Sequence, residues 1–176
     1  MQPPTINARE RIGLFRRTLA SPDAPDALKA FDLVWLLHLV GDAHQPLHAT
    51  SRFTHADPTG DDGGNKEKVC TPTCGVKLHA FWDDVLGSSE NVSAAISAAR
   101  TLPVVDPAQA GVSDEATWVA ESFQAAQQFA YAAPVGAGNG PFHLDSRYKA
   151  NAKALARDRV ALAGMRLANL LNNELK

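Results

Sequence analysis

The sequence predicts an all-α protein, a multi-helix bundle-like domain with one long loop. Three observations favour this fold class. Apolar residues recur at helical spacing over most of the chain, capping residues precede several of these segments, and we find no convincing strand. A chain of 176 residues is long enough to bury a core without further support, so we expect residues 1–176 to form one domain.

The first two helices are expected on either side of a Ser-Pro-Asp-Ala-Pro break. Asn7 followed by Glu10 forms a capping pair for a helix that runs through about Ala20. Asp26 can cap the second helix, which is apolar on nearly every face, so we expect it to be buried on most sides. Residues 49–76 then lose the helical period and collect Gly, Asp, Thr and Pro, which predicts the long loop.

Helical character returns near His79. Ser113 can cap a further helix, and Ala, Pro and Gly residues at 132–141 end it. A long last helix is expected to present one apolar face, formed by Ala152, Ala156, Val160, Ala163, Leu167, Leu170 and Leu171.

Composition and charge exclude several function classes. Hydrophobic residues make up 45% of the chain, yet no apolar run approaches the roughly 20 residues that a membrane span needs. The formal charge of −2 leaves no general basic field for nucleic acid, so any attraction would be local, with bound metal as its source. The first residues show no basic stretch that leads into an apolar one, so no signal peptide is visible.

The two cysteines, Cys70 and Cys74, allow a small disulfide loop in an oxidising compartment, with Pro72 at the turn. Two free thiols are the alternative, and we favour the disulfide. A zinc site of four cysteines is excluded because the chain has only two.

The most informative segment is His-Leu-Val-Gly-Asp-Ala-His-Gln-Pro-Leu-His, residues 38–48. On a helix, His38 and Asp42 lie four residues apart and point the same way. Their neighbours are mostly apolar, so the carboxylate would lose hydration unless it is paired or bound to metal. Pro46 must kink or end the helix, which lets His48 turn back toward the other two side chains.

A second pair, His79 and Asp83, has the same spacing and similar apolar neighbours. Together with His38, Asp42 and His48 it makes five ligands of the kind that zinc prefers. Five ligands exceed the need of one tetrahedral zinc, so we expect at least two metals. Two metals bridged by a carboxylate suit phosphoester hydrolysis, since one activates water and the other stabilises the leaving oxygen.

Each of these residues also has an ordinary structural interpretation. Asp42 and Asp83 could pair with arginines such as Arg157 or Arg159 on the last helix. For His44, His55 and His143 we favour the role of core histidines, because none has a partner at metal spacing. The segment 61–65, Asp-Asp-Gly-Gly-Asn, is typical of a turn, and its position between the two pairs makes Asn65 a candidate for substrate contact at the cleft rim.

These motifs resemble the zinc-dependent single-strand-specific nucleases of the fungal and plant type in order, spacing and intervening residues. The resemblance rests on residues 38–48, on Gly63-Gly64-Asn65 and on Leu78-His79-Ala80-Phe81-Trp82-Asp83. It extends to segments 118–122 and 163–168 and covers nearly the whole chain.

The resemblance implies a mostly helical fold shared with bacterial zinc phospholipases C, and a secreted or periplasmic location. It implies three zinc ions in the complete family members and cleavage of single-stranded DNA and RNA to 5′-nucleotides, with removal of 3′-phosphates from nucleotides as a further activity. His38 and Asp42 would bind one zinc, with Asp42 as the catalytic, bridging carboxylate. His48, His79 and Asp83 would complete another site.

Some ligands of the family have no counterpart here. Relatives use a mature N-terminal tryptophan, a nearby histidine, and a further aspartate and histidine, all upstream of the segment that matches His38. The residues before His38 contain no histidine. We therefore expect one complete zinc site, and either an incomplete copy that lacks its N-terminal third or a degenerate member of the family.

Two other functions fit the same residues. A zinc phospholipase C shares the helix with His, Asp and His at this spacing, but typically carries Glu where this chain has Asp83. A non-catalytic zinc-binding helical protein follows if the chain is complete as it stands. Activity on a phosphocholine lipid would identify the first, and tightly held zinc without hydrolysis would identify the second.

Overall fold

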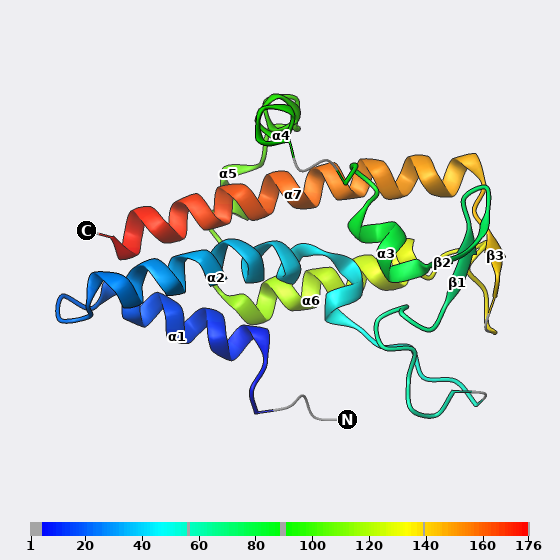
Figure 1. The fold of residues 1–176 in the computed structure, drawn as a ribbon, viewed down its shortest axis with the longest axis horizontal. Coiled ribbons are helices and arrows are strands. Elements are labelled where there is room, and N and C mark those ends of the chain that lie inside the picture. The colour runs from blue at the N-terminus through cyan, green and yellow to red at the C-terminus, as the bar shows by residue number, and fades with distance from the viewer. Residues whose placement is uncertain (1–4, 56, 89–90, 139, 176) are drawn as a thin grey trace.

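A computed structural model describes residues 5–55, 57–88, 91–138 and 140–175. Four long helices run side by side through the body of the protein, and a small sheet lies at one end (Figure 1). The long helices are α1 (Ala8–Ala20), α2 (Asp26–His44), α6 (Glu115–Ala125) and α7 (Ser146–Glu174). The shorter helical segments are η1 (Pro46–Ala49), α3 (Leu78–Asp83), α4 (Val92–Ala99), α5 (Pro107–Ala110) and η2 (Ala126–Ala130). The predicted mainly helical fold class is confirmed. Among the helices described, none is both long and apolar enough to cross a membrane.

Capping residues explain where α1 and α6 begin. The Asn7 side chain accepts a hydrogen bond from the backbone N–H of Glu10, as the sequence predicts. Two predicted caps are wrong. Asp26 is the first residue of α2 and not its cap, and Asp114 caps α6 in place of Ser113. In α6 the carboxylate of Asp114 bonds both the backbone and the hydroxyl group of Thr117, which Ser113 is one residue too early to do.

Pro46 ends α2 as expected, because the helix stops at His44 and a 3₁₀ turn begins at Pro46. Gln45 lies at the junction in an extended conformation, with φ −81° and ψ 123°. The chain therefore changes direction between Asp42 and His48, and this change carries His48 to the side of α2 where α3 begins.

The expectation of a protein without strands is wrong, and the loop predicted over residues 49–76 is shorter than expected. β1 (Lys68–Cys70) pairs antiparallel with β2 (Cys74–Lys77) and parallel with β3 (Phe142–His143), in the order β2-β1-β3. These strands contain two to four residues each. Such short strands show no usable period in the sequence, and β3 comes from a distant part of the chain.

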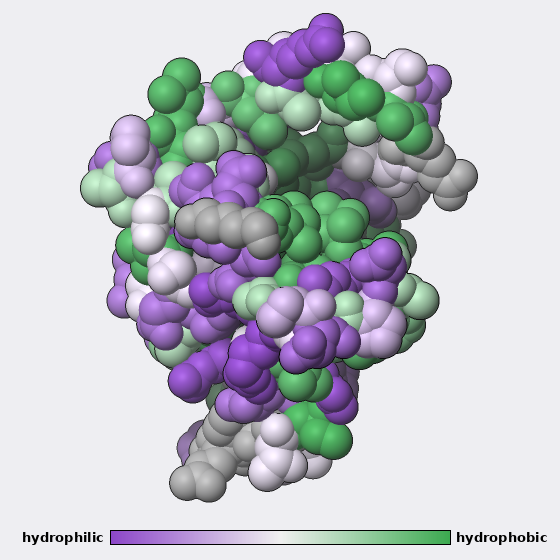
Figure 2. Space-filling view, turned by 90° about the vertical axis from the view of Figure 1, so that its left-hand side faces the viewer, coloured by the Kyte–Doolittle hydropathy of each residue, from purple (hydrophilic) through white to green (hydrophobic). Residues whose placement is uncertain are grey.

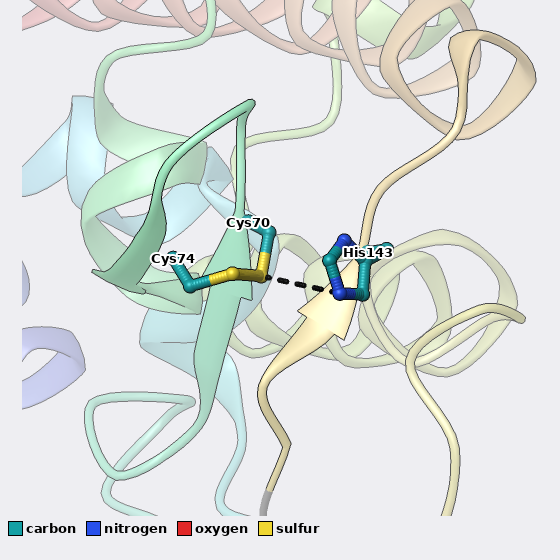
Figure 3. Close-up of a disulfide and its surroundings, with 3 residues drawn as sticks. All are labelled: Cys70, Cys74 and His143. Atoms are coloured by element: carbon teal, nitrogen blue, oxygen red, sulfur yellow. Dashed lines mark hydrogen bonds between the residues drawn. A yellow bond between two sulfur atoms is a disulfide. The ribbon is translucent and has the colours of Figure 1, made fainter.

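The predicted bond between Cys70 and Cys74 is present as a disulfide (Figure 3). It closes the tight turn that joins β1 to β2. The ring of His143 on β3 lies beside it, with Nε2 3.8 Å from Sγ of Cys70. The disulfide and the sheet together hold the chain segment that leads directly into α3, and α3 carries two of the predicted ligands.

Two apolar clusters form the core. One joins α1, α2, α6 and α7 through Ile12, Phe15, Leu19, Leu36, Val40, Ala43, Trp118, Ala163 and Leu170. The other lies around α3, η1, η2 and the start of α7, and it includes Leu47, Leu78, Trp82 and Tyr148. The second cluster packs beneath η1 and α3, so it supports the segments that carry His48, His79 and Asp83.

The expectation that α2 is buried on most sides is wrong. Its buried apolar residues, including Leu36 and Val40, face α1, α6 and α7. The opposite face is open: Phe31 is 56% exposed and Val34 is 65% exposed. Figure 2 shows hydrophobic residues gathered around a recess in the upper half of that view, above a mainly hydrophilic lower half. Within the described residues, α1, α6 and α7 therefore cover only one face of α2.

Candidate metal centre

The five predicted ligands lie in one continuous row. His38 Nε2 is 3.1 Å from Asp42 Oδ2, and His48 Nδ1 is 3.8 Å from the same carboxylate. On its other side, His48 Nε2 is 3.8 Å from Asp83 Oδ1, while His79 Nε2 is 3.6 Å from Asp83 Oδ2. His48 therefore joins the pair on α2 to the pair on α3.

His48, His79 and Asp83 form the tightest group of this row. One ligand atom from each lies within 4.8 Å of the others. Zinc bound at about 2.0 Å to nitrogen and oxygen in a tetrahedron separates neighbouring ligand atoms by about 3.3 Å. The separations from His48 to Asp83 Oδ1, 3.8 Å, and from His79 to Asp83 Oδ2, 3.6 Å, are somewhat longer than that value and involve different oxygens of the carboxylate. The donor set therefore fits a zinc ion if the side chains move so that one oxygen of Asp83 faces both imidazoles.

The imidazole of His79 is held by a backbone carbonyl. Its Nδ1 lies 2.7 Å from the carbonyl oxygen of Gly63. Since the carbonyl can only accept, Nδ1 carries the proton, and Nε2 keeps its lone pair toward Asp83 and His48. Gly63 has φ +64°, a left-handed conformation that favours glycine. The turn over residues 61–65 thus orients a predicted ligand, a role that the sequence did not indicate.

Gln45 also contacts a predicted ligand, which the sequence did not indicate. Its side-chain amide nitrogen donates to Asp83 Oδ1 at 2.8 Å. Its side-chain oxygen accepts from the backbone N–H of Leu47 in the first turn of η1. Gln45 lies between His44 and His48 of the motif, and this position is the one feature of the sequence that could have pointed to its role.

Burial is the main influence on the protonation of His48. Loss of hydration holds the pKa of His48 below its ordinary value, although Asp42 opposes the shift by favouring the charged ring. The nearby ring of His79, with its centroid 4.7 Å away, adds to the lowering. A lower pKa keeps the imidazole neutral at neutral pH, which is the form that binds a metal.

The two residues of the outer pair, His38 and Asp42, differ in how enclosed they are. The His38 side chain is 63% exposed, whereas that of Asp42 is 26% exposed.

The alternative pairing of Asp42 and Asp83 with arginine is wrong within the described residues. Arg159 bonds Glu121, Ser122 and the carbonyl of His44, and Arg157 bonds Thr101.

A cavity of about 470 Å³ adjoins the row of ligands. Asp42, His48 and Asp83 lie at its edge, and its walls are mostly apolar side chains of α2, α7 and the segment after α3. Val160 and Leu167, which the sequence assigns to the apolar face of the last helix, line this cavity. The candidate centre therefore opens onto a hollow and not onto a flat surface.

The three histidines that were expected in the core have different surroundings. His44 is buried and hydrogen-bonded, as predicted. His55 and His143 are exposed, so the core assignment is wrong for both. His143 lies beside Cys70 and Cys74, but their sulfur atoms are bonded to each other and so offer no thiolate to a metal. Asn65 bonds the carbonyl of Asp62 and so holds its own turn.

Comparison with known proteins gives the family. The profile described as S1/P1 Nuclease matches residues 2–176. The chain belongs to the S1/P1 nuclease family. It is also 43% identical over 54 residues to Endonuclease 3 of Arabidopsis thaliana, a match that covers 31% of this chain and 16% of that protein. The match to the S1/P1 nuclease family confirms the resemblance seen in the sequence, and the mainly helical fold agrees with it.

Proposed function

We propose that this member of the S1/P1 nuclease family is a zinc-dependent phosphodiesterase that hydrolyses single-stranded DNA or RNA to 5′-nucleotides. The observation that carries the proposal is the convergence of His48, His79 and Asp83, from η1 and α3, with one ligand atom of each within 4.8 Å of the others. The family membership supports nucleic acid as substrate in preference to a phosphocholine lipid.

Each residue of the row has a role in this proposal. His48, His79 and Asp83 hold one zinc, and the bond to Gly63 keeps His79 in the tautomer that binds metal. His38 and Asp42 contribute to the site of a second metal, and Asp42 is the carboxylate that the two metals would share. Bound zinc would supply Lewis-acid stabilisation of a phosphate group and would lower the pKa of water. Asn65 is a candidate contact for substrate at the rim.

An anionic substrate needs a local source of attraction, because the chain has a formal charge of −2. Asp42 and Asp83 repel phosphate unless a cation offsets their charge. We therefore expect nucleic acid binding, as well as hydrolysis, to require zinc. A secreted or periplasmic location agrees with the disulfide and with the family, and forms part of the proposal.

The test combines metal analysis with hydrolysis of a single-stranded oligonucleotide. We expect zinc to remain bound after dialysis, and we expect chelation to abolish hydrolysis and added zinc to restore it. His48→Ala should lose the tightly bound zinc, whereas the matched control His55→Ala, at an exposed histidine of the following loop, should retain it.

Three outcomes would contradict the proposal. Hydrolysis that persists after complete zinc removal would exclude zinc dependence. Zinc bound tightly by a protein that cleaves no nucleic acid would favour a non-catalytic zinc-binding protein. Preferential cleavage of a phosphocholine lipid would favour the phospholipase C activity.

A further inference from the structure

Gln45 occupies a position from which one side chain can control two of the three ligands in the tightest group. It lies between the end of α2 and the first turn of η1. Its amide oxygen accepts from the N–H of Leu47, next to His48. Its amide nitrogen donates to Asp83 at the end of α3. The two contacts link segments that are 38 residues apart.

The orientation of the amide follows from its partners. The backbone N–H of Leu47 can only donate, so the side-chain oxygen of Gln45 must face it. The nitrogen is then directed toward Asp83, whose ionised carboxylate can only accept. A flipped amide would place a donor against a donor and an acceptor against an acceptor. Gln45 is therefore suited to these two neighbours in one orientation only.

The contact also divides the carboxylate of Asp83 between two tasks. Oδ1 accepts the hydrogen bond from Gln45 at 2.8 Å, while Oδ2 is the oxygen nearest His79 Nε2, at 3.6 Å. The Asp83 side chain is 47% exposed and would sample several rotamers without a partner. A hydrogen bond to Oδ1, the oxygen that also lies 3.8 Å from His48 Nε2, restricts that motion and leaves Oδ2 directed toward His79.

We propose that Gln45 is a positioning residue, which orients Asp83 and the turn that carries His48 so that the zinc site is formed before the metal binds. This inference rests on the proposed function, since it assumes that zinc binds His48, His79 and Asp83. Groups that hold metal ligands from behind typically contribute 10- to 100-fold in metal affinity. We expect an effect of that size from the loss of the Asp83 contact.

Gln45→Asn separates the two contacts. The shorter amide can still accept from Leu47 N–H, because asparagine bonds the backbone two residues ahead in an Asx turn, but it is too short to reach Asp83. The control is Gln124→Asn, the same change at an exposed glutamine of α6. Zinc affinity is measured by competition with a chromophoric chelator, and the stability of the metal-free protein by urea unfolding.

We expect Gln45→Asn to weaken zinc binding by about tenfold or more, with metal-free stability close to that of the wild type and of Gln124→Asn. Cobalt bound in place of zinc should show an altered visible absorption band in Gln45→Asn, since that band reports the ligand geometry. If Gln45→Asn does not fold, Gln45→Ser keeps a capping oxygen and removes the same contact.

The possible outcomes distinguish failure of this inference from failure of the proposed function. A wild-type protein that binds no zinc would overturn the proposed function and this inference with it. Wild-type affinity and an unchanged cobalt band in the folded Gln45 variants would overturn the positioning role alone. A loss of zinc affinity that matches an equal loss of metal-free stability would show an ordinary structural role and would also overturn it.

Discussion

His44 Nε2 and Arg166 Nη1 lie 2.9 Å apart in the core between α2 and α7. The Nδ1 atom of His44 lies 2.8 Å from the carbonyl oxygen of Val40 and donates to it. Nε2 must therefore accept from the guanidinium, which fixes the neutral tautomer. Glu121 forms ion pairs with both Arg166 and Arg159, so its single negative charge offsets one of their two positive charges. Although burial opposes the shift, hydrogen bonds from these arginines hold the pKa of Glu121 below its usual range.

This arrangement predicts loss of stability in mild acid. Burial lowers the pKa of His44 from 6.5 to about 4, and the neighbouring arginines add to the effect. Because the folded pKa lies below the unfolded one, the unfolded chain binds more protons between these values, and stability falls as pH decreases from 6.5 to 4. The expected contribution of His44 to this loss is on the order of 3 kcal/mol. Urea unfolding at a series of pH values measures it.

Two histidine variants separate this effect from other titrations. His44→Gln removes the titrating group and should flatten the stability profile between pH 6.5 and 4, at a lower stability overall. His55→Gln, at an exposed histidine, should keep the slope of the wild type. Equal slopes in wild type and His44→Gln would exclude His44 as the source.

Replacement of Gly63 is expected to disturb both the fold and the zinc site. A Cβ atom at Gly63 would lie 2.5 Å from the backbone oxygen of Leu47, and φ is +64°. Gly63→Ala must therefore move the backbone whose carbonyl orients His79. We expect a loss of about 1–3 kcal/mol in the free energy of unfolding and weaker zinc binding, measured by urea unfolding and chelator competition.

The matched control for this change is Gly75→Ala in β2. Gly75 also has a positive φ, +112°, but a Cβ atom there meets nothing within 4 Å. Gly75→Ala should cost stability through its backbone conformation and leave zinc affinity unchanged. Equal loss of affinity in both variants would show that general destabilisation, and not the Gly63 carbonyl, controls the site.

The hydroxyl group of Tyr148 on α7 makes a hydrogen bond with Trp82 on α3. It accepts from Trp82 Nε1 at 3.1 Å and donates to the carbonyl of Ala130 at 2.7 Å. Tyr148→Phe leaves both buried groups without this partner, so we expect a loss of about 1–3 kcal/mol by urea unfolding. The effect should be smaller in a Trp82→Phe background, because the indole N–H is then absent. Full additivity of the two changes would contradict the proposed hydrogen bond.

The disulfide is expected to make a modest contribution to stability. Cys70 and Cys74 are separated by four positions, and closing so short a loop stabilises the fold by about 2 kcal/mol on the chain-entropy estimate. A dithiol reductant should lower the free energy of unfolding of the wild type by about that amount. A variant with both Cys70→Ser and Cys74→Ser should have the stability of the reduced protein and no response to reductant. Reductant sensitivity in that variant would point to another cause.

Much of the helical layout was predictable because it depends on local chemistry. The capping bond of Asn7, the end of α2 before Pro46 and the disulfide all involve residues within a few positions of each other. The strands were not predictable, since β1 and β3 are distant in sequence and very short. The open face of α2 was not predictable either, because an apolar sequence reports what a helix can bury and not which elements lie against it.

The sequence by itself determined which side chains are candidate metal ligands and how each pair is spaced. His38 with Asp42, and His79 with Asp83, share a helix face because four residues make about one helical turn. Only the tertiary structure showed that Gly63 orients His79 and that Gln45 contacts Asp83, 38 residues away. It also gave the distance of 3.8 Å between His48 Nε2 and Asp83 Oδ1, two residues whose grouping the family resemblance had implied. Those relationships depend on how η1, α3 and the turn pack over a common core, and no local rule specifies that packing.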